Sequence, residues 1–250
     1  MELYFNVEIE FDAGRVDEVI QTTIREGGKG YVCSVESNNL TIANLNPCFR
    51  EVINGGLVNI CDGSNLAWIL GKIYHKPFKS YIGADLFTHY VSTGKYRQYF
   101  LGNTPEVLSG LQANLSKTDS KISGMCFEEL PFLPVADFDY KGIAAKINQD
   151  NPDIIWVSLG APKQEEFMSR LLPYINRGVM FGFGAIFNFN AGVGSVKRAP
   201  LGMRRLHLEW LYRAFEEPKK NVPRYARFIK LLPHLLINEY KMKKTRGNEA

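Results

Sequence analysis

The sequence lacks the features that mark several broad classes of protein. Its longest apolar run lies near residues 179–187, far short of the roughly 20 residues that a membrane-spanning helix needs. The N-terminal stretch, MELYFNVEIEFD, is acidic and alternating, so it lacks the basic start and apolar run of a secretory signal. We therefore expect a protein that does not cross a membrane and that resides in the cytoplasm.

Cysteine and histidine are scarce and scattered. The four cysteines, Cys33, Cys48, Cys61 and Cys126, form no CxxC pair, and the four histidines are equally dispersed. This spacing supports neither a zinc site nor a disulfide framework. We expect buried, reduced thiols.

Net charge is small but unevenly placed. The 250 residues carry 30 Lys and Arg against 26 Asp and Glu, a formal charge of +4 that does not by itself indicate nucleic-acid binding. From Lys197 onward, however, 14 side chains are basic and 5 are acidic, so a basic tail follows an acidic body. A hydrophobic content of 45% supports a real core and argues against a disordered or fibrous chain.

Short β-rich runs alternate with helical patterns before the tail. This alternation predicts an α/β fold, with a largely parallel sheet flanked by helices. The expected strands are at 4–11, 30–35, 57–61, 98–101, 121–126, 154–159 and 179–182. The expected helices include 15–25, 39–52, 105–116, 140–149 and 163–172.

Strand signals stop at about Pro200, and basic helical segments follow. We therefore expect an α/β core at 1–199 and a helical appendage at 200–250, with helices at 201–215 and 223–240 and a frayed polar end. Apolar residues recur at helical spacing in the second helix: Tyr225, Phe228, Leu231, Leu232, Leu235 and Leu236. Such a stripe fits a helix docked on the core, or one that rests on an anionic membrane surface. Nucleic-acid binding is not indicated, because no recognised reader motif accompanies the basic residues.

Polar residues directly after the strands are candidates for a site, because ligands of open α/β sheets bind at the carboxyl ends of strands. Asp62 follows one strand, Ser34 and Glu36 end another, and the segment 160–165 follows a third. Asp62 and the segment 160–165 also fit an ordinary turn or helix cap. As chemistry, a carboxylate at Asp62 could accept a proton from a substrate hydroxyl.

Two short motifs are too weak to identify a function. The Gly-Phe-Gly at 182–184 matches the start of a dinucleotide-binding fingerprint, but Phe187 occupies the third glycine position. The Asp-Phe-Asp at 137–139 spells the DxD of metal-dependent sugar transferases, although Pro131 and Pro134 predict an exposed loop there. These matches are the only sequence evidence for a nicotinamide cofactor or a bound metal, and we expect neither.

Basic residues of the tail form a longer series. It comprises Lys197, Arg198, Arg204, Arg205, Arg213, Lys219, Lys220 and Arg224. Guanidinium groups match phosphate oxygens, so cations near a sugar nucleotide could neutralise a departing diphosphate without a metal. A solvated basic face explains these residues one by one, but it explains the series less well.

The ordered set of motifs resembles the WecG/TagA/CpsF family, which is glycosyltransferase family 26. The resemblance runs from about Gly30 to Arg224, and the order is more specific than any single piece. Its parts are Asp62-Gly63, Gly83-Ala84-Asp85-Leu86, Phe100-Leu101-Gly102-Asn103, Gly160-Ala161-Pro162-Lys163-Gln164-Glu165, Gly182-Phe183-Gly184, Arg198-Ala199-Pro200, Leu208-Glu209-Trp210-Leu211-Tyr212-Arg213 and Glu217-Pro218.

This resemblance implies an inverting glycosyltransferase that needs no metal and no cofactor. Members transfer N-acetylmannosamine or its uronic acid from a UDP-sugar to a polyprenyl-diphosphate-linked N-acetylglucosamine. They act at the cytoplasmic membrane face, in the synthesis of teichoic acid linkage units, enterobacterial common antigen or capsule. The implied fold is a Rossmann-like α/β domain with a helical C-terminal appendage, whose undocking lets the core self-associate as a homo-oligomer.

The resemblance also implies roles for individual residues. Asp62 matches the proposed general base, which takes the proton of the acceptor hydroxyl as its oxygen attacks the anomeric carbon opposite UDP. Gln164 matches a pocket residue. The remaining matches to substrate-binding motifs are Gly83, Asp85, Gly102 and Arg198, together with Arg213, Lys220 and Arg224 of the basic, membrane-targeting segment that is thought to engage the diphosphate.

One departure from the family pattern concerns the end of the strand at 30–35. Many members have Thr-x-Asn where this chain has Ser34-Val35-Glu36. Ser34 keeps a hydroxyl, but Glu36 adds an anion where a sugar or diphosphate should lie, which leaves the donor sugar open. The change also motivates an alternative function, a catalytically silent module that binds a sugar nucleotide or a lipid diphosphate.

Overall fold

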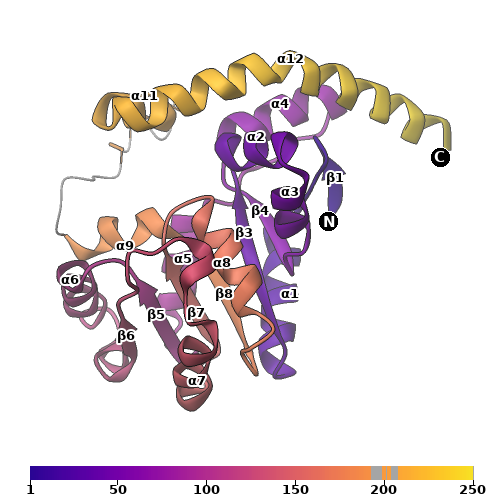
Figure 1. The fold of residues 1–250 in the computed structure, drawn as a ribbon. Coiled ribbons are helices and arrows are strands. Elements are labelled where there is room, and N and C mark those ends of the chain that lie inside the picture. Colours follow the sequence, from indigo (N-terminus) through magenta and orange to yellow (C-terminus); the bar gives the residue numbers. More distant parts are fainter. Residues whose placement is uncertain (193–198, 201, 204–207, 250) are drawn as a thin grey trace.

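A six-stranded parallel sheet forms the middle layer of the molecule (Figure 1). The computed structural model describes residues 1–192, 199–200, 202–203 and 208–249. The strand order is β4-β3-β8-β7-β5-β6, and every neighbouring pair is parallel. The strands are β3 (Lys29–Val35), β4 (Val58–Cys61), β5 (Gln98–Gly102), β6 (Cys126–Glu128), β7 (Ile154–Ser158) and β8 (Gly178–Gly182). The expected α/β fold is confirmed.

Two sets of helices cover the two faces of this sheet. Side chains of one hydrophobic cluster come from α1 (Ala13–Arg25), α5 (Gly83–Ser92), α6 (Pro105–Leu115) and α9 (Gly184–Ala191). Those of the other come from α2 (Ser37–Leu45), α3 (Pro47–Asn54), α4 (Ser64–Tyr74), α7 (Tyr140–Asp150) and α8 (Lys163–Leu171). In β7, Trp156 joins the first cluster, whereas Ile155 and Val157 join the second. Because both faces are covered, every residue of β7 is buried, as is typical of parallel strands.

The strand expected at 4–11 is instead a hairpin of β1 (Glu2–Tyr4) and β2 (Val7–Ile9). Phe5 and Asn6 have φ angles of 48° and 63° and form the two residues of the turn. Positive φ at both central positions is what a type I′ hairpin turn requires. The sequence concealed the turn because a bulky Phe rarely adopts this conformation.

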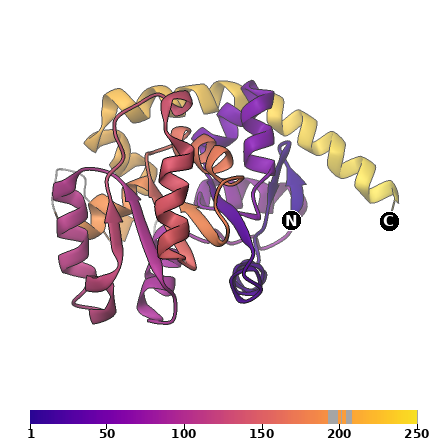
Figure 2. The same ribbon diagram turned by 60° about the horizontal axis from the view of Figure 1, so that its bottom comes forward.

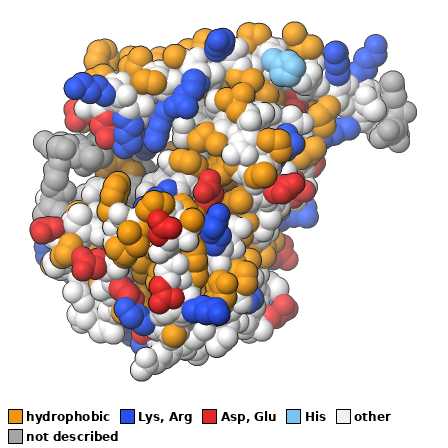
Figure 3. Space-filling view, viewed as in Figure 1, with side chains coloured by type: hydrophobic (Ala, Val, Ile, Leu, Met, Phe, Trp, Pro, Cys, Tyr) orange, Lys and Arg blue, Asp and Glu red, His pale blue; other side chains and the backbone are white. Residues whose placement is uncertain are grey.

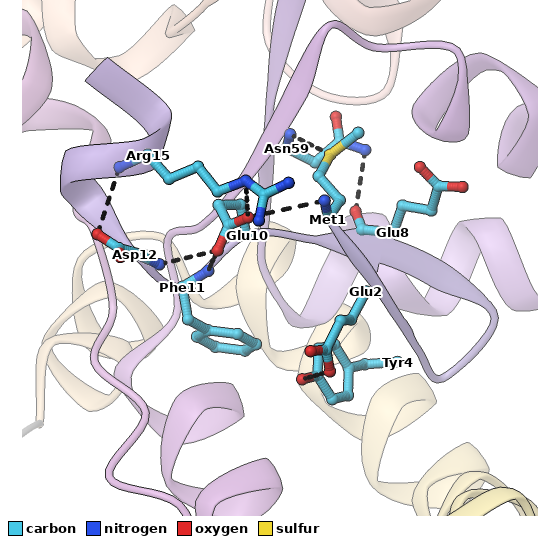
Figure 4. Close-up of polar contacts among 9 residues, drawn as sticks. All are labelled: Met1, Glu2, Tyr4, Glu8, Glu10, Phe11, Asp12, Arg15 and Asn59. Atoms are coloured by element: carbon cyan, nitrogen blue, oxygen red, sulfur yellow. Dashed lines mark hydrogen bonds and ion pairs between the residues drawn. The ribbon is translucent and has the colours of Figure 1, made fainter. Parts of the chain in front are cut away.

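Polar contacts tie the hairpin and the segment after it to the core (Figure 4). Asn59 of β4 donates from Nδ2 to the carbonyl of Glu8 at 3.0 Å. The carboxylate of Glu10 accepts the backbone N–H groups of Phe11 and Asp12 at 3.0 and 3.1 Å. The hairpin is therefore an integral part of the second helical layer.

Two further expectations about secondary structure were wrong in detail. The strand at 121–126 is a 3₁₀ turn, η1 (Ser120–Gly124), and β6 begins only at Cys126. The helix at 39–52 is two helices, because Asn46 ends α2 and caps α3 with its side chain. Helices α4, α5 and α9 were not expected, since each begins beside a glycine that indicates a turn when it is read alone.

The cysteines are free thiols, as expected, but they are not all buried. Cys33 and Cys61 are buried in β3 and β4, Cys126 is half-buried, and Cys48 is exposed on α3. Burial raises the pKa of the Cys61 thiol to about 12. Cys61 is therefore a packing residue at the end of its strand.

The tail forms two helices, α11 (Glu209–Glu216) and α12 (Pro218–Glu249). Figures 1 and 2 show α12 running along one end of the molecule, from α11 past α2 to the side of the β1–β2 hairpin. The expected frayed end is wrong, because α12 continues to Glu249. The expected boundary at residues 199/200 remains a prediction, and part of the helix expected at 201–215 lies outside the described residues.

The apolar stripe of α12 faces the core. Leu235 is buried in the second cluster, and Phe228, Leu231 and Leu236 pack against it. This arrangement is the docked-helix alternative of the two that the spacing allowed. In the described part of the chain, no helix is both long enough and apolar enough to span a membrane.

Candidate active site

The carboxyl ends of the strands meet at the edge of the sheet nearest the appendage. Helix α12 packs against α2, which directly follows β3, and the charge of Arg213 acts on Asp62 after β4. The chain passes from β3 to β4 on one side, whereas β8 lies on the other side of β3. Open α/β sheets bind ligands outside the carboxyl ends of their strands, and β3 and β4 are neighbours at that end.

Asp62 is the first residue after β4, and its side chain is held by a backbone group. The N–H of Gly83, which begins α5, donates to Asp62 Oδ1 at 2.9 Å. A Cβ at position 83 would lie 2.9 Å from the ring of Phe183, so glycine is needed for this approach. Two motifs of the sequence, at 62 and 83, therefore meet, with Gly83 positioning the carboxylate.

The environment of Asp62 makes it a stronger proton acceptor than an ordinary aspartate. Its side chain keeps some contact with solvent, but exclusion of most surrounding water raises the pKa of Asp62 to about 6. The Gly83 N–H and the positive charge of Arg213 lower this pKa, whereas Glu36 and Glu209 raise it. Asp62 is thus ionised above about pH 6 and can still take a proton near neutrality.

Arg213 lies in α11, and its positive charge is the part of the appendage that lowers the pKa of Asp62. Its Nη2 donates to Glu209 Oε1 at 3.0 Å, one helical turn earlier. Partial burial lowers the pKa of Arg213, but the carboxylates of Glu209 and Asp62 raise it more. A permanent positive charge therefore stands near the carboxylate expected to act as a base.

The hairpin between α11 and α12 has its own internal contacts. Asn221 Nδ2 donates to the carbonyl of Arg213 at 2.8 Å, and the rings of Trp210 and Tyr225 meet edge to face with centroids 5.9 Å apart. The charges of Glu36 and Arg213 act on the Tyr225 hydroxyl. These contacts hold Arg213 in a folded unit above the ends of β3 and β4.

Lys220 and Arg224, the other described basic residues expected to bind phosphate, are less closely tied to Asp62. Lys220 forms an ion pair with Glu217 at 3.0 Å, and its side chain is exposed. Arg224 is half-buried on α12, and Arg198 lies outside the described residues. Figure 3 shows Lys and Arg side chains gathered along α11 and the adjoining part of α12, above a hollow in the surface.

Glu36 has a structural role that the sequence analysis did not assign to it. Its carboxylate caps α2, accepting the N–H of Asn38 at 2.8 Å and that of Asn39 at 3.2 Å. The anion is therefore engaged by its own helix N-terminus. Ser34 is only 7% exposed, and its hydroxyl has no hydrogen-bond partner in the described structure.

Gln164, expected to bind substrate, has a side chain whose hydrogen bonds all go to the protein. Oε1 accepts the N–H groups of Gly160 at 3.1 Å and Gly184 at 3.0 Å. Nε2 donates to the carbonyl of Gly182 at 2.6 Å and to Glu165 at 3.0 Å. Because an amide side chain offers two acceptor and two donor positions, Gln164 is saturated, and it fastens the β7–α8 turn to the β8–α9 turn.

The Gly-Phe-Gly at 182–184 follows from the same contact. A Cβ at Gly184 would lie 2.7 Å from the backbone nitrogen of Gly160 and 3.0 Å from Gln164 Oε1. The glycine is therefore required by the packing of two turns. This role accounts for the motif without a dinucleotide.

Glu165, beside Gln164, is fully buried and connects α8 to α2. Its Oε1 accepts Asn39 Nδ2 at 3.1 Å as well as Gln164 Nε2. Asn39 Nδ2 also donates to the carbonyl of Ser34 at 2.8 Å. Glu165 lay within the candidate segment 160–165, but the sequence analysis gave a role only to its neighbour Gln164. Asn39 was not singled out, because an Asn at a helix start is an ordinary capping residue.

The two remaining expected residues lie on α5 and β5. Gly102 ends β5 with a φ of 96°, and a Cβ there would lie 2.7 Å from the carbonyl of Ser158. Asn103, the next residue, donates to Ser158 Oγ at 3.0 Å. Asp85 lies in the first turn of α5, two residues after Gly83, and its role in binding remains a prediction.

The Asp-Phe-Asp at 137–139 is only partly the exposed loop that the prolines indicated. Phe138 is buried against Phe167, with ring centroids 5.0 Å apart. Asp139 caps α7 by accepting the N–H of Gly142 at 2.9 Å. The segment thus serves to start a helix.

Comparison with known proteins identifies the family of the chain. The model of the glycosyl transferase WecG/TagA/CpsF family matches residues 5–246. The chain is 28% identical over 223 residues, covering 83% of this chain and 81% of the relative, to an N-acetylglucosaminyldiphosphoundecaprenol N-acetyl-beta-D-mannosaminyltransferase of Bacillus spizizenii. It is 29% identical over 212 residues, covering 79% of this chain and 75% of the relative, to the protein of the same name from Bacillus subtilis (strain 168). The chain belongs to the WecG/TagA/CpsF family of glycosyltransferases.

Proposed function

We propose that this glycosyltransferase moves N-acetylmannosamine, or its uronic acid, from a UDP-sugar to a polyprenyl-diphosphate-linked N-acetylglucosamine. The names of the two Bacillus relatives support the acceptor and the N-acetylmannosaminyl group. The observation that carries the proposal is Asp62, a carboxylate held by Gly83 at a strand end and facing the charge of Arg213. The product belongs to a cell-surface polysaccharide.

In this reaction Asp62 acts as the general base. The acceptor hydroxyl oxygen forms a bond to the anomeric carbon while the bond from that carbon to the UDP oxygen breaks. The hydroxyl proton passes to Asp62, and attack from the face opposite UDP inverts the anomeric configuration. The raised pKa of Asp62 supports this role, because a base is most effective when its pKa lies near the working pH.

The leaving diphosphate needs positive charge as its bond breaks. Arg213, Lys220 and Arg224, with Arg198, supply it in this proposal, without a metal and without a cofactor. The ion pairs of Arg213 with Glu209 and of Lys220 with Glu217 are compatible with this role. Solvent-exposed pairs of this kind contribute little to stability, so a diphosphate can replace the carboxylate partner at small cost.

The enzyme works at the inner face of the cytoplasmic membrane in this proposal. Although the expected apolar stripe of α12 packs against the core through Leu235 and its neighbours, the helix also carries the exposed apolar residues Val222, Ile229, Ile237 and Tyr240. The same helix carries the exposed basic residues Arg227, Lys230, Lys241 and Lys244. Apolar burial and attraction to acidic lipid would add on such a surface, which brings the enzyme to its lipid-linked acceptor.

The alternative of a non-catalytic binding module is not favoured. It was motivated by the extra anion of Glu36, and that carboxylate caps α2. Asp62 keeps both the position and the raised pKa that a base requires.

Replacing Asp62 tests the proposal. With UDP-N-acetylmannosamine and a lipid-diphosphate-N-acetylglucosamine, we expect D62N to lower kcat by about 10²- to 10⁴-fold, the usual cost of losing a base. The matched control is D137N, an exposed aspartate of the DxD segment, which should retain wild-type turnover. Full activity of folded D62N would remove the assigned base.

The pH dependence gives a second measure of the same group. Asp62 must be ionised to accept a proton, so kcat/KM should fall as the pH drops through about 6. An acid limb near the ordinary aspartate pKa of 3.8 would contradict the raised value.

A further inference from the structure

A group of unpaired polar atoms lies beneath the β3–α2 turn. Glu165 Oε2, Asn39 Oδ1, Asn38 Nδ2 and Ser34 Oγ are buried, and none has a hydrogen-bond partner in the described structure. They belong to residues that are at most 7% exposed. Buried polar atoms without partners are costly, so this group calls for an explanation that Asp62 and Arg213 do not provide.

Glu165 connects the members of this group. Its Oε1 receives one N–H from Asn39 on α2 and one from Gln164 on α8. Through these two amides the carboxyl group reaches the carbonyl of Ser34 and the turns at Gly160 and Gly182. One buried carboxyl group therefore joins three of the strand ends that border the site.

The surroundings of Glu165 favour a neutral carboxylic acid. No Lys or Arg among the described residues forms an ion pair with it, and its exposure is 0%. The titratable groups that face it are Glu36 from α2 and the Cys33 thiol from β3, and its other partners are neutral amides. A buried carboxylate with a second carboxylate nearby and no cation is unfavourable.

We propose that Glu165 is a positioning residue whose protonated form holds the β3–α2 and β7–α8 turns together as one wall of the site, and that its ionisation loosens this wall. In the protonated form Oε1 keeps both hydrogen bonds, while the proton on Oε2 becomes a donor among the unpaired acceptors. Burial raises the pKa of Glu165 to about 7, although hydrogen bonds from Gln164 and Asn39 lower it. This inference rests on the proposed transfer reaction for its kinetic consequence only.

The kinetic consequence is a second limb in the pH profile. Asp62 must lose its proton for transfer, and Glu165 must keep its proton for a firm site. The wild-type kcat/KM should therefore rise through about pH 6 and decline several-fold above about pH 7. A bell-shaped profile results when one group must be deprotonated and another must be protonated for activity.

The test compares E165Q, E165A and E166Q with wild type. Gln at 165 keeps the acceptor oxygen and places an N–H where the acid has its O–H, so E165Q should keep wild-type kcat/KM at pH 6.5 within about threefold and lose the alkaline decline. E165A loses both hydrogen bonds and should be less active at every pH. E166Q removes a half-buried carboxylate from the next position of α8 and should keep the wild-type profile.

Thermal unfolding separates this inference from the proposed reaction. The folded-state pKa of Glu165, about 7, lies above its ordinary 4.5. Its protonated form therefore stabilises the fold below about pH 4.5, and that stability is lost progressively as the pH rises from about 4.5 to about 7. E165Q should show a smaller loss of melting temperature over this range than wild type and E166Q. An alkaline limb unchanged in E165Q, equal activity of E165A and E165Q, or a folded E165Q inactive at every pH would each overturn the proposal. If no variant, wild type included, transferred sugar, the unfolding curves alone would decide it.

Discussion

The two ends of the C-terminal appendage are held to the molecule in different ways. Toward its C-terminus, α12 is fastened by a buried carboxylate, because Glu239 accepts the backbone N–H of Phe5 at 2.6 Å and the hydroxyl of Tyr74 at 2.5 Å. At the other end, the hydrogen bonds and ion pairs of α11 and the first turns of α12 join Arg213, Asn221 and their neighbours within the appendage. The N-terminal half of the appendage therefore carries the charge that lowers the pKa of Asp62, whereas the C-terminal half anchors α12 to the core.

More contacts strengthen the fastened end. Lys243 donates to the carbonyl of Ile73 at 2.6 Å, and Arg246 donates to the carbonyl of Leu3 at 2.6 Å. Since a helix is a stiff rod that rises about 1.5 Å per residue, a fixed end determines where the distant end can reach. The difference teaches that the placement of Arg213 depends on residues remote from the reaction.

The largest effect is expected at the half that acts on Asp62. R213Q removes the positive charge that lowers the pKa of Asp62, so its acid limb should move to higher pH. Loss of one charged donor at a transition state commonly costs about 10²-fold in kcat. Steady-state kinetics between pH 5 and about 8 measure both quantities.

K220Q is the matched control for R213Q. Lys220 is paired with Glu217 and exposed, so its replacement should reduce activity less and leave the acid limb in place. If the acid limb of R213Q stayed at the wild-type pH, the charge of Arg213 would not lower the pKa of Asp62, and the proposed difference between the two ends of the appendage would be wrong.

A smaller effect is expected at the fastened end. E239A leaves the N–H of Phe5 and the hydroxyl of Tyr74 without their acceptor, which should cost about 1–3 kcal/mol of docking free energy. Amide hydrogen exchange of α12 should accelerate while exchange in β7 and β8 stays slow.

Two variants sharpen this result. E239Q retains an acceptor oxygen and should fall between wild type and E239A, and E216A removes an exposed glutamate of α11 and should leave exchange unchanged. If E239A exchanged like wild type, the contacts at Glu239 would not be what fastens the helix.

The smallest effect is expected at exposed apolar residues of α12, which take no part in anchoring the helix or in the charge effect on Asp62. Ile229 and Ile237 are 65% and 56% exposed. Replacing both with Ser should weaken binding to vesicles of acidic lipid by about tenfold, without lowering the melting temperature, because only exposed apolar area is lost. Vesicle sedimentation measures it.

The control for this variant is Tyr174→Ser, at an exposed aromatic residue that precedes β8. It should sediment like wild type. Equal sedimentation of the double variant and wild type would show that α12 does not contact the lipid surface through these residues.

The sequence was informative about the sheet because alternation and burial act over a few neighbouring residues. The runs at 30–35, 98–101 and 154–159 became β3, β5 and β7 almost unchanged. The N-terminal hairpin escaped prediction because its turn uses Phe5 in an uncommon conformation. Helix α12 was expected from its stripe, but spacing alone cannot tell which surface covers an apolar face.

The candidate site was predictable one residue at a time and not as an arrangement. Asp62 and Gly83 were both named, yet their hydrogen bond depends on how α5 packs beside Phe183. Glu36 was expected to place an anion near the substrate, but its carboxylate accepts hydrogen bonds from the first turn of α2 and caps that helix. Glu165 lay in a candidate segment but received no role of its own, because its contact with Asn39 joins residues 126 positions apart in the sequence.

The pairing of Glu239 with Phe5 also bears on the order in which the chain assembles. These residues are 234 positions apart, and closing so long a loop is slow compared with forming local contacts. The sheet and its helices therefore have the opportunity to fold before α12 docks across the β1–β2 hairpin. On a ribosome, the anchoring residues of α12 emerge after the sheet and the β1–β2 hairpin, so the surface on which the appendage docks is synthesised before the appendage itself.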